Sequence, residues 1–110
     1  MKKLILFVSF IFISSNSLAG FTSGNELQQW LSISENKKQP DFNSGLYKGY
    51  VSGVIDVGNK YAFCLSTGVT RGQAIAVVSK YIKNNPEKWN KGAASLVIKG
   101  LKKAFPCTKT

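Results

Sequence analysis

Apolar residues recur at intervals of three and four along most of the chain, and polar or glycine-containing segments interrupt this periodicity. Such intervals gather the apolar side chains on one face of an α-helix. Four helices are predicted in this way, over residues 24–33, 45–57, 71–83 and 86–105. Residues 34–43 and 58–69 lack the pattern and are predicted to be loops. No long alternation typical of a strand occurs, so the predicted fold class is all-α, a small four-helix domain.

Polar residues mark the starts of three predicted helices. Ser23 with Glu26 fits a capping box, in which each residue's side chain binds the other's backbone N–H, and Thr70 with Gln73 fits a second one. Asn85 before a proline is expected to cap the last helix. Local side-chain chemistry therefore indicates where these helices begin.

The first nineteen residues differ from the rest of the chain. Two lysines precede the apolar run 4–13, and small residues stand at Ser17 and Ala19. A charged start, an apolar centre and small residues at the −3 and −1 positions are the parts of a secretory signal peptide. As a helix, the apolar run would cover about 15 Å, which is half of a hydrocarbon core, so no membrane span is expected. We expect cleavage after Ala19 and export, which leaves residues 20–110 as one domain.

Composition narrows the chemistry available to the exported domain. Two of the fifteen Lys and Arg residues lie in the predicted signal peptide, so the domain keeps thirteen against five Asp and Glu residues, a formal charge of +8. No histidine is present, which excludes histidine catalysis and histidine-containing zinc sites, and no glycine-rich phosphate loop occurs. No enzyme activity, no cofactor and no metal site are expected. Asp56, in the glycine-rich helix, is interpreted as a polar residue near a helix end.

The surplus of basic residues has several possible uses. It would steer an acidic protein partner and raise the association rate. Nucleic acid is disfavoured, because an exported protein meets little of it and no interleaved aromatic and basic strand motif is present. Binding to anionic lipid of the envelope and a merely solvating surface are the alternatives.

The two cysteines, Cys64 and Cys107, belong to a chain that is expected to be exported. One disulfide between them is the default in an oxidising compartment. The chain-entropy model assigns about 4 kcal/mol to a loop of this length. A free catalytic thiol is disfavoured, because no histidine is available to lower its pKa.

Glycine recurs every four residues on the second predicted helix, at Gly45, Gly49 and Gly53. Each glycine costs a helix about 1 kcal/mol relative to alanine. Close approach of another helix or of a second copy of the chain would explain this groove, and simple tolerance by the fold is the alternative.

Five segments in a fixed order resemble the Rap/Tai family of periplasmic immunity proteins. They are Gly24-Asn25-Glu26-Leu27 with Trp30, residues 49–56 (GYVSGVID), Phe63-Cys64-Leu65 with Gly68-Val69-Thr70, Asn85-Pro86-Glu87, and Ala104-Phe105-Pro106-Cys107. The resemblance covers about residues 21–107. It implies a helical domain, often a homodimer, that protects a bacterium from a type VI secretion peptidoglycan amidase, a papain-like Cys/His enzyme. Inhibition would be stoichiometric, by occlusion of the active-site groove.

Occlusion requires a protruding element, and the sequence offers two. The first is the connector after the second predicted helix, with candidate toxin-binding residues Asn59, Lys60, Tyr61 and Phe63. Aromatic residues dominate binding hot spots, although Tyr61 or Phe63 could equally belong to the core. The second is the turn beside Trp89, with candidate residues Asn84, Asn85, Glu87 and Lys88.

One departure from the family pattern bears on stability. Members often carry a second cysteine pair, at the positions of Leu31 and Tyr47 here. Both cysteines are absent together, which leaves open how firmly the first helix is held. The alternative function is that of a small periplasmic stress chaperone or envelope-binding protein. A neighbouring gene for a small Cys/His amidase would distinguish the immunity protein from this alternative.

Overall fold

The structure, a computed structural model, describes residues 21–36 and 41–108. The elements in chain order are α1 (Gly24–Asn36), α2 (Phe42–Gly58), α3 (Arg71–Asn84), the 3₁₀ turn η1 (Pro86–Lys88) and α4 (Ala93–Ala104). In this part of the chain the β-structure consists of isolated bridges, so the all-α fold with four helices is confirmed. No helix in it is long and apolar enough to cross a membrane. The predicted signal peptide and its cleavage after Ala19 lie outside the described residues.

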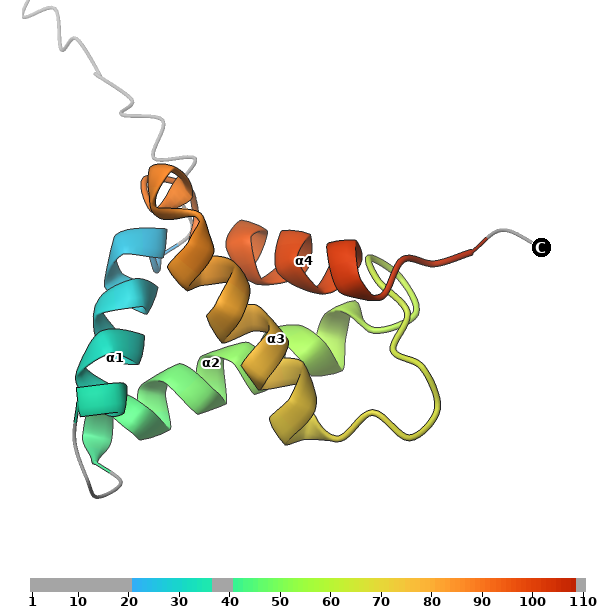
Figure 1. The fold of residues 1–110 in the computed structure, drawn as a ribbon, viewed down its shortest axis with the longest axis horizontal. Helices are drawn as coiled ribbons and strands as arrows, with labels where there is room; N and C mark the ends of the chain where they lie inside the picture. The colour runs from blue at the N-terminus through green and yellow to red at the C-terminus, as the bar shows by residue number, and fades with distance from the viewer. Residues whose placement is uncertain (1–20, 37–40, 109–110) are drawn as a thin grey trace, which may run out of the picture.

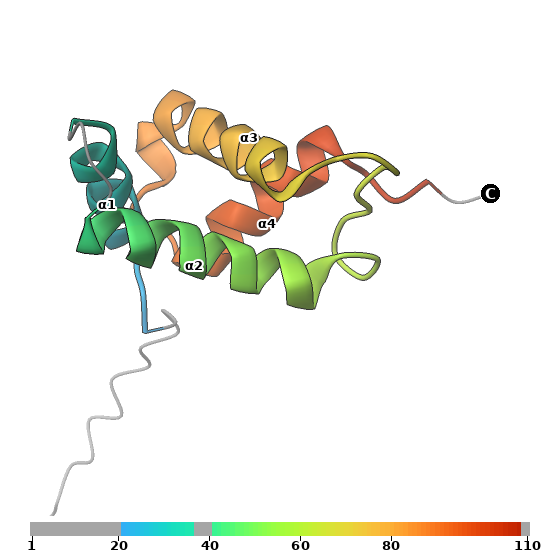
Figure 2. The same cartoon turned by 90° about the horizontal axis from the view of Figure 1, so that it is seen from below.

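The four helices pack around one apolar core (Figures 1 and 2). α1 lies across one end of α2, while α4 packs against both α2 and α3. Every helix contributes side chains at helical spacing, and the loop residue Phe63 joins them. The buried residues are Leu27, Leu31, Tyr47, Val51, Ile55, Phe63, Ala74, Val78, Ile82, Ala93, Leu96, Val97 and Leu101. The predicted apolar stripes thus form the core.

Capping explains where the first three helices begin. The Thr70–Gln73 capping box is complete, with both hydrogen bonds present at 2.8 and 3.1 Å. At α1, the backbone N–H of Glu26 donates to the Ser23 hydroxyl at 3.1 Å. α2 begins at Phe42, earlier than predicted, because the Asp41 carboxylate accepts from the Ser44 N–H at 3.0 Å. Asp41 therefore caps a helix start that apolar spacing alone does not mark.

The last predicted helix, 86–105, is wrong in its first third. The chain makes η1 and a turn there, and α4 begins only at Ala93. The Gly24 N–H donates to the Lys91 carbonyl oxygen at 2.7 Å, and the Ala93 N–H donates to the Thr22 carbonyl oxygen at 3.0 Å. These two hydrogen bonds pair the turn with the start of α1. Asn85 does not cap the following turn either, because its amide donates to the Tyr81 carbonyl oxygen at 2.8 Å. Tertiary partners thus replace the helical hydrogen bonds that the periodicity predicted.

The disulfide between Cys64 and Cys107 is present, as predicted. It joins the connector after α2 to the segment after α4, with the two Cα atoms 4.9 Å apart. Beside it, the Cys64 N–H donates to the carbonyl oxygen of Phe105 at 2.8 Å. The C-terminal end of α4 is therefore attached to the connector by a covalent bond and a hydrogen bond.

The two positions of the missing cysteine pair both lie in the core. Leu31 is 4% exposed and Tyr47 is 2% exposed. The Tyr47 hydroxyl lies 2.7 Å from the Ser79 hydroxyl, which itself donates to the carbonyl oxygen of Ile75 at 2.9 Å. Since a serine hydroxyl has one hydrogen, Tyr47 must be the donor to Ser79. Apolar burial and a hydrogen bond between α2 and α3 thus occupy the place of a second disulfide.

The burial of Tyr47 leads to a prediction of how the free energy of unfolding changes at high pH. Burial raises the pKa of Tyr47 to about 12. In the unfolded chain a tyrosine ionises near pH 10, so unfolding releases a proton between about pH 10 and 12. The stabilisation is complete below about pH 10 and is lost as the pH rises towards 12, with a total of up to about 3 kcal/mol.

Urea unfolding of the wild type and of Tyr47→Phe between pH 8 and 12 measures this contribution, because other ionisations are common to both proteins. At pH 8 the variant should be less stable by about 1 kcal/mol, the net value of one hydrogen bond. The difference should shrink and then reverse as the pH rises. Parallel curves for the two proteins would contradict the assignment.

Candidate functional site

Residues 58–63 form a tight turn at the end of α2, which we call the tip. Its two aromatic residues have opposite environments: Phe63 is fully buried, whereas Tyr61 is 89% exposed. The Phe63 ring lies so close to Gly58 that a Cβ on that glycine would be 2.7 Å from the ring. Phe63 therefore anchors the tip in the core and is not available to a partner, while Tyr61 is presented to solvent.

Hydrogen bonds fix the shape of the tip. The N–H groups of Tyr61 and Ala62 both donate to the Gly58 carbonyl oxygen, at 3.0 and 2.9 Å, and the Lys60 N–H donates to the Phe63 carbonyl oxygen at 2.7 Å. The Asn59 side chain accepts from the Leu65 N–H at 3.0 Å. Asn59 thus holds the turn, and Lys60 and Tyr61 are the exposed side chains of the tip.

Lys60 has a φ of +75°, in the left-handed region that favours glycine. A non-glycine residue in this region destabilises the fold by roughly 1 kcal/mol. Its side chain is exposed, so the core gains nothing from it.

The second candidate, the turn at residues 84–88, is more engaged in the fold. The Lys88 ammonium donates to the Tyr81 hydroxyl at 3.2 Å and lies 5.6 Å from the centre of that ring. The neighbouring Trp89 indole N–H donates to the Ile82 carbonyl oxygen at 2.8 Å. Asn84 and Glu87 are exposed, whereas the Asn85 amide is bound to α3. In both views this turn lies at the opposite end of the molecule from the tip, so the two candidates do not form one site (Figures 1 and 2).

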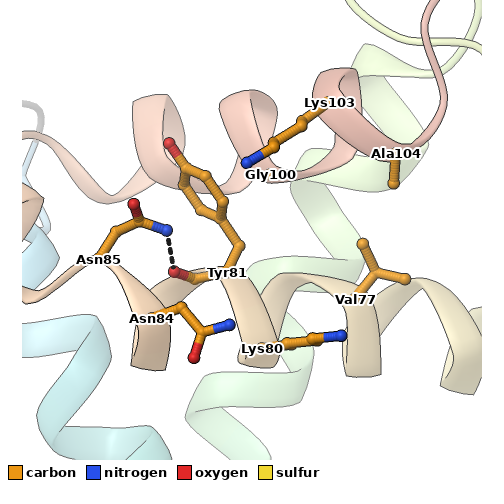
Figure 3. Close-up of a pocket in the computed structure, with 8 residues that line it drawn as sticks. All are labelled: Val77, Lys80, Tyr81, Asn84, Asn85, Gly100, Lys103 and Ala104. Atoms are coloured by element: carbon orange, nitrogen blue, oxygen red, sulfur yellow. Dashed lines mark hydrogen bonds between the residues drawn. The ribbon is translucent and has the colours of Figure 1, made fainter.

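Two hollows flank α4, on opposite faces of the helix. The first, the α2–α4 groove, has a volume of about 540 Å³ and an apolar lining that includes Gly49, Tyr50, Gly53, Val54, Ala94 and Ile98. The second, the α3–α4 cleft, has a volume of about 580 Å³ and contains Val77, Lys80, Tyr81, Asn84, Lys103 and Ala104 (Figure 3). One hollow is therefore apolar and the other is basic.

The α2–α4 groove continues to the tip. Val57 and Gly58 also line it, and Val57 is 78% exposed. At the other end the Tyr50 ring makes an edge contact with Trp30, with ring centres 6.3 Å apart. Burial raises the pKa of Tyr50, and a hydrogen bond with the Ala94 backbone partly offsets the rise. The apolar groove therefore reaches the first residue of the tip, Gly58.

The three glycines of α2 face outward. A Cβ added to Gly45, Gly49 or Gly53 would meet no atom within 4 Å in the described structure, so no other helix of it packs directly on these glycines. Close packing occurs instead at Gly24, Gly58 and Gly100. At Gly100 an added Cβ would lie 3.0 Å from Tyr81 Cβ, so this glycine lets α4 approach α3. The helical wheel places Gly100 on the core face but does not distinguish it from an alanine.

The described residues hold no group of three or more His, Cys, Asp or Glu residues that could bind a metal ion. The carboxylates are dispersed: Asp56 lies 4.0 Å from Arg71, and Glu35 lies 3.0 Å from Lys83. Both pairs are solvent-exposed surface pairs. The exposed features are an aromatic tip, an apolar groove and a basic cleft, all of which suit binding to a protein partner.

A comparison with protein families matches residues 23–107 to the model of the Rap1a immunity proteins. The match spans all four helices and both cysteines of the disulfide. A comparison with curated proteins gave no match.

Alanine substitution distinguishes the two classes of glycine. Gly49→Ala should raise the free energy of unfolding by about 1 kcal/mol, because alanine favours a helix and its Cβ meets no neighbour. Gly24→Ala should instead destabilise by about 2 kcal/mol or more, because its Cβ would lie 2.6 and 2.9 Å from the carbonyl oxygens of Trp89 and Lys91. Chemical denaturation at a concentration that keeps the protein monomeric measures both. Equal effects of the two substitutions would show that the packing described for Gly24 is wrong.

Proposed function

Since the chain belongs to the Rap1a immunity proteins, we propose that it protects the cell by binding and inhibiting a type VI secretion peptidoglycan amidase. Membership in this family supports the general part of the proposal, that the chain gives immunity to an effector. The amidase is proposed from the resemblance of the five sequence segments to the Rap/Tai family. Inhibition by binding requires no turnover and is compatible with the dispersed carboxylates and the absence of histidine.

We place this activity in the periplasm. A peptidoglycan amidase acts there, and an inhibitor must meet it in the same compartment. The Cys64–Cys107 disulfide supports export, because such bonds persist in oxidising compartments. Export would use the predicted signal peptide, residues 1–19.

The tip is the proposed inhibitory element, and the exposed Tyr61 carries the proposal. A ring that is 89% exposed on a turn fixed by backbone hydrogen bonds can enter a groove with little loss of conformational entropy. Tyrosine combines a large apolar area with a hydroxyl that can bond polar groups, and for this reason it is common among hot spots. Lys60, in its strained conformation beside it, adds a positive charge.

We further propose that the protein is a homodimer that associates through the outer face of α2. Phe42 and Val57, each 78% exposed, stand near the two ends of this helix, and the glycines Gly45, Gly49 and Gly53 lie between them. These glycines cost the helix about 3 kcal/mol in propensity, and in the described structure nothing packs within 4 Å of where their Cβ atoms would stand. Two such helices crossing about a two-fold axis would bring the glycine surfaces together and cover the exposed side chains.

Substitutions in the tip test the inhibitory role. Tyr61→Ala should weaken binding to the neighbouring amidase by at least about 30-fold, the magnitude of a hot spot, and leave the melting temperature unchanged. Lys60→Gly should also weaken inhibition, yet raise the free energy of unfolding by roughly 1 kcal/mol, because glycine adopts a positive φ without strain. Calorimetry, an amidase assay and chemical denaturation give the three readouts.

Phe21→Ala is the matched control, since it removes another fully exposed aromatic residue, which precedes α1 and belongs neither to the tip nor to the proposed dimer face. It should leave amidase inhibition intact. Full inhibition by Tyr61→Ala would exclude the tip as the inhibitory element, and a wild type that fails to bind the amidase would exclude the proposed target.

Sedimentation equilibrium tests the dimer. The wild type is expected to be dimeric at micromolar concentration, and Gly49→Leu is expected to be monomeric, because a leucine would hold the two helices apart. The variant monomer should fold at least as well, since leucine favours a helix more than glycine and position 49 has no intrachain neighbour. A dimer that persists in the variant would place the interface elsewhere.

A further inference from the structure

The α3–α4 cleft carries a concentration of positive charge that the tip and the dimer face do not use. Lys80 and Asn84 line it from α3, and Lys103 lines it from α4 (Figure 3). Lys88 does not line the hollow, but its ammonium donates to the hydroxyl of Tyr81, which does. Among the residues that line this hollow there is no aspartate or glutamate.

These lysines lack carboxylate partners. Within residues 21–36 and 41–108 the ion pairs are those of Arg71 with Asp56 and of Lys83 with Glu35, and neither involves a cleft residue. Lys103 also follows Lys99 by four residues on α4, a like-charge spacing that destabilises a helix. No carboxylate of the described residues therefore balances the charges of the cleft.

Helix dipoles account for only part of this arrangement. Lys103 lies in the last turn of α4, where a cation interacts favourably with the negative end of the helix. Lys80 lies outside the last turn of α3, in which Lys83 is the basic residue. The dipole therefore does not explain why a second lysine faces the same hollow from α3.

The shape of the cleft favours a side chain over a flat surface. Its wall contains the Tyr81 ring, Val77 and Ala104, and polar nitrogens lie on both sides. Apolar walls suit the methylene groups of a glutamate or aspartate, and the ammonium and amide groups suit its carboxylate. A bilayer surface would contact the rims of such a hollow and leave its walls uncovered.

The cleft runs from the turn at Asn84 and Asn85, at the far end of the molecule, towards the tip at its Ala104 end (Figures 1 and 2). Ala104 lines it, and the next residue, Phe105, accepts the hydrogen bond from Cys64 that attaches α4 to the connector. Cys64 directly follows Phe63, the anchor of the tip. A partner that receives the tip therefore has its neighbouring surface near this end of the cleft.

We propose that the α3–α4 cleft binds a carboxylate side chain on an acidic segment of the effector, next to the surface that receives the tip. This inference rests on the proposed function and adds a second contact region to it. The lysines steer the effector towards the inhibitor, and the cleft fixes the orientation in which the tip meets the enzyme.

The test compares two double variants of the full mature protein that remove equal charge. Lys80→Gln with Lys103→Gln alters the cleft, and Lys48→Gln with Lys91→Gln alters exposed lysines elsewhere. At low salt the cleft variant should associate with the amidase at least about fivefold more slowly, and the control less than about twofold. The difference should vanish at 1 M salt, where the Debye length is about 3 Å. Equal slowing in both variants would overturn the proposal, because net charge alone would then be responsible.

A second measurement keeps the two proposals separable. Failure of the wild type to bind the amidase would contradict the proposed function. An NMR titration with a hexaglutamate peptide then tests, without the amidase, whether the cleft binds carboxylates. Shifts confined to residues near Tyr81, Asn84 and Gly100, and abolished by the cleft variant, would support the carboxylate site. Shifts spread over all lysines would overturn it. Binding to phosphatidylglycerol vesicles that requires Lys80 and Lys103, without binding to the peptide, would assign the surface to lipid and also overturn it.

Discussion

The return of the connector to the core at Phe63 and Cys64 is the constraint on which the rest of the structure depends. Phe63 is fully buried against Gly58, and the next residue is bonded to Cys107 and to the Phe105 carbonyl oxygen. A domain this small buries a limited apolar area, so a cross-link worth about 4 kcal/mol is a large part of its stability. Because the same joint closes the fold and anchors the tip, the element proposed for inhibition gains its rigidity from the core.

The position of α4 divides the surface into regions with different chemistry. One side of this helix meets α2 along an apolar groove, and the other meets α3 along a basic cleft. Gly100 allows the close approach of α3, whereas the glycines of α2 remain open to the outside. The molecule therefore offers a partner an aromatic tip, an apolar face and a cationic hollow. These are the properties of a binding protein, and they match its membership in the Rap1a immunity proteins.

Both departures from the predicted helix pattern have the same physical origin. α2 begins earlier than predicted because Asp41 accepts a hydrogen bond from a free N–H at its start. Residues 86–92 do not form the predicted α-helix, because their backbone groups and the Trp89 indole bond to α1 and α3 instead. The loss of a second cysteine pair is likewise accommodated by contacts, since Leu31 and Tyr47 are both core residues. In each case a hydrogen bond or a buried surface from elsewhere in the chain overrides the local preference.

The sequence by itself determined the helical class, the core stripes, the capping box at Thr70 and the disulfide, because these follow from residue spacing and from the presence of only two cysteines. It also located the tip. Only the tertiary structure decided that Phe63 is inside and Tyr61 outside, that Gly24 and Gly100 are packed while Gly49 is open, and that Lys80 and Lys103 line the same cleft. Periodicity assigns a residue to a face of its own helix, whereas burial and pairing depend on which other helix covers that face.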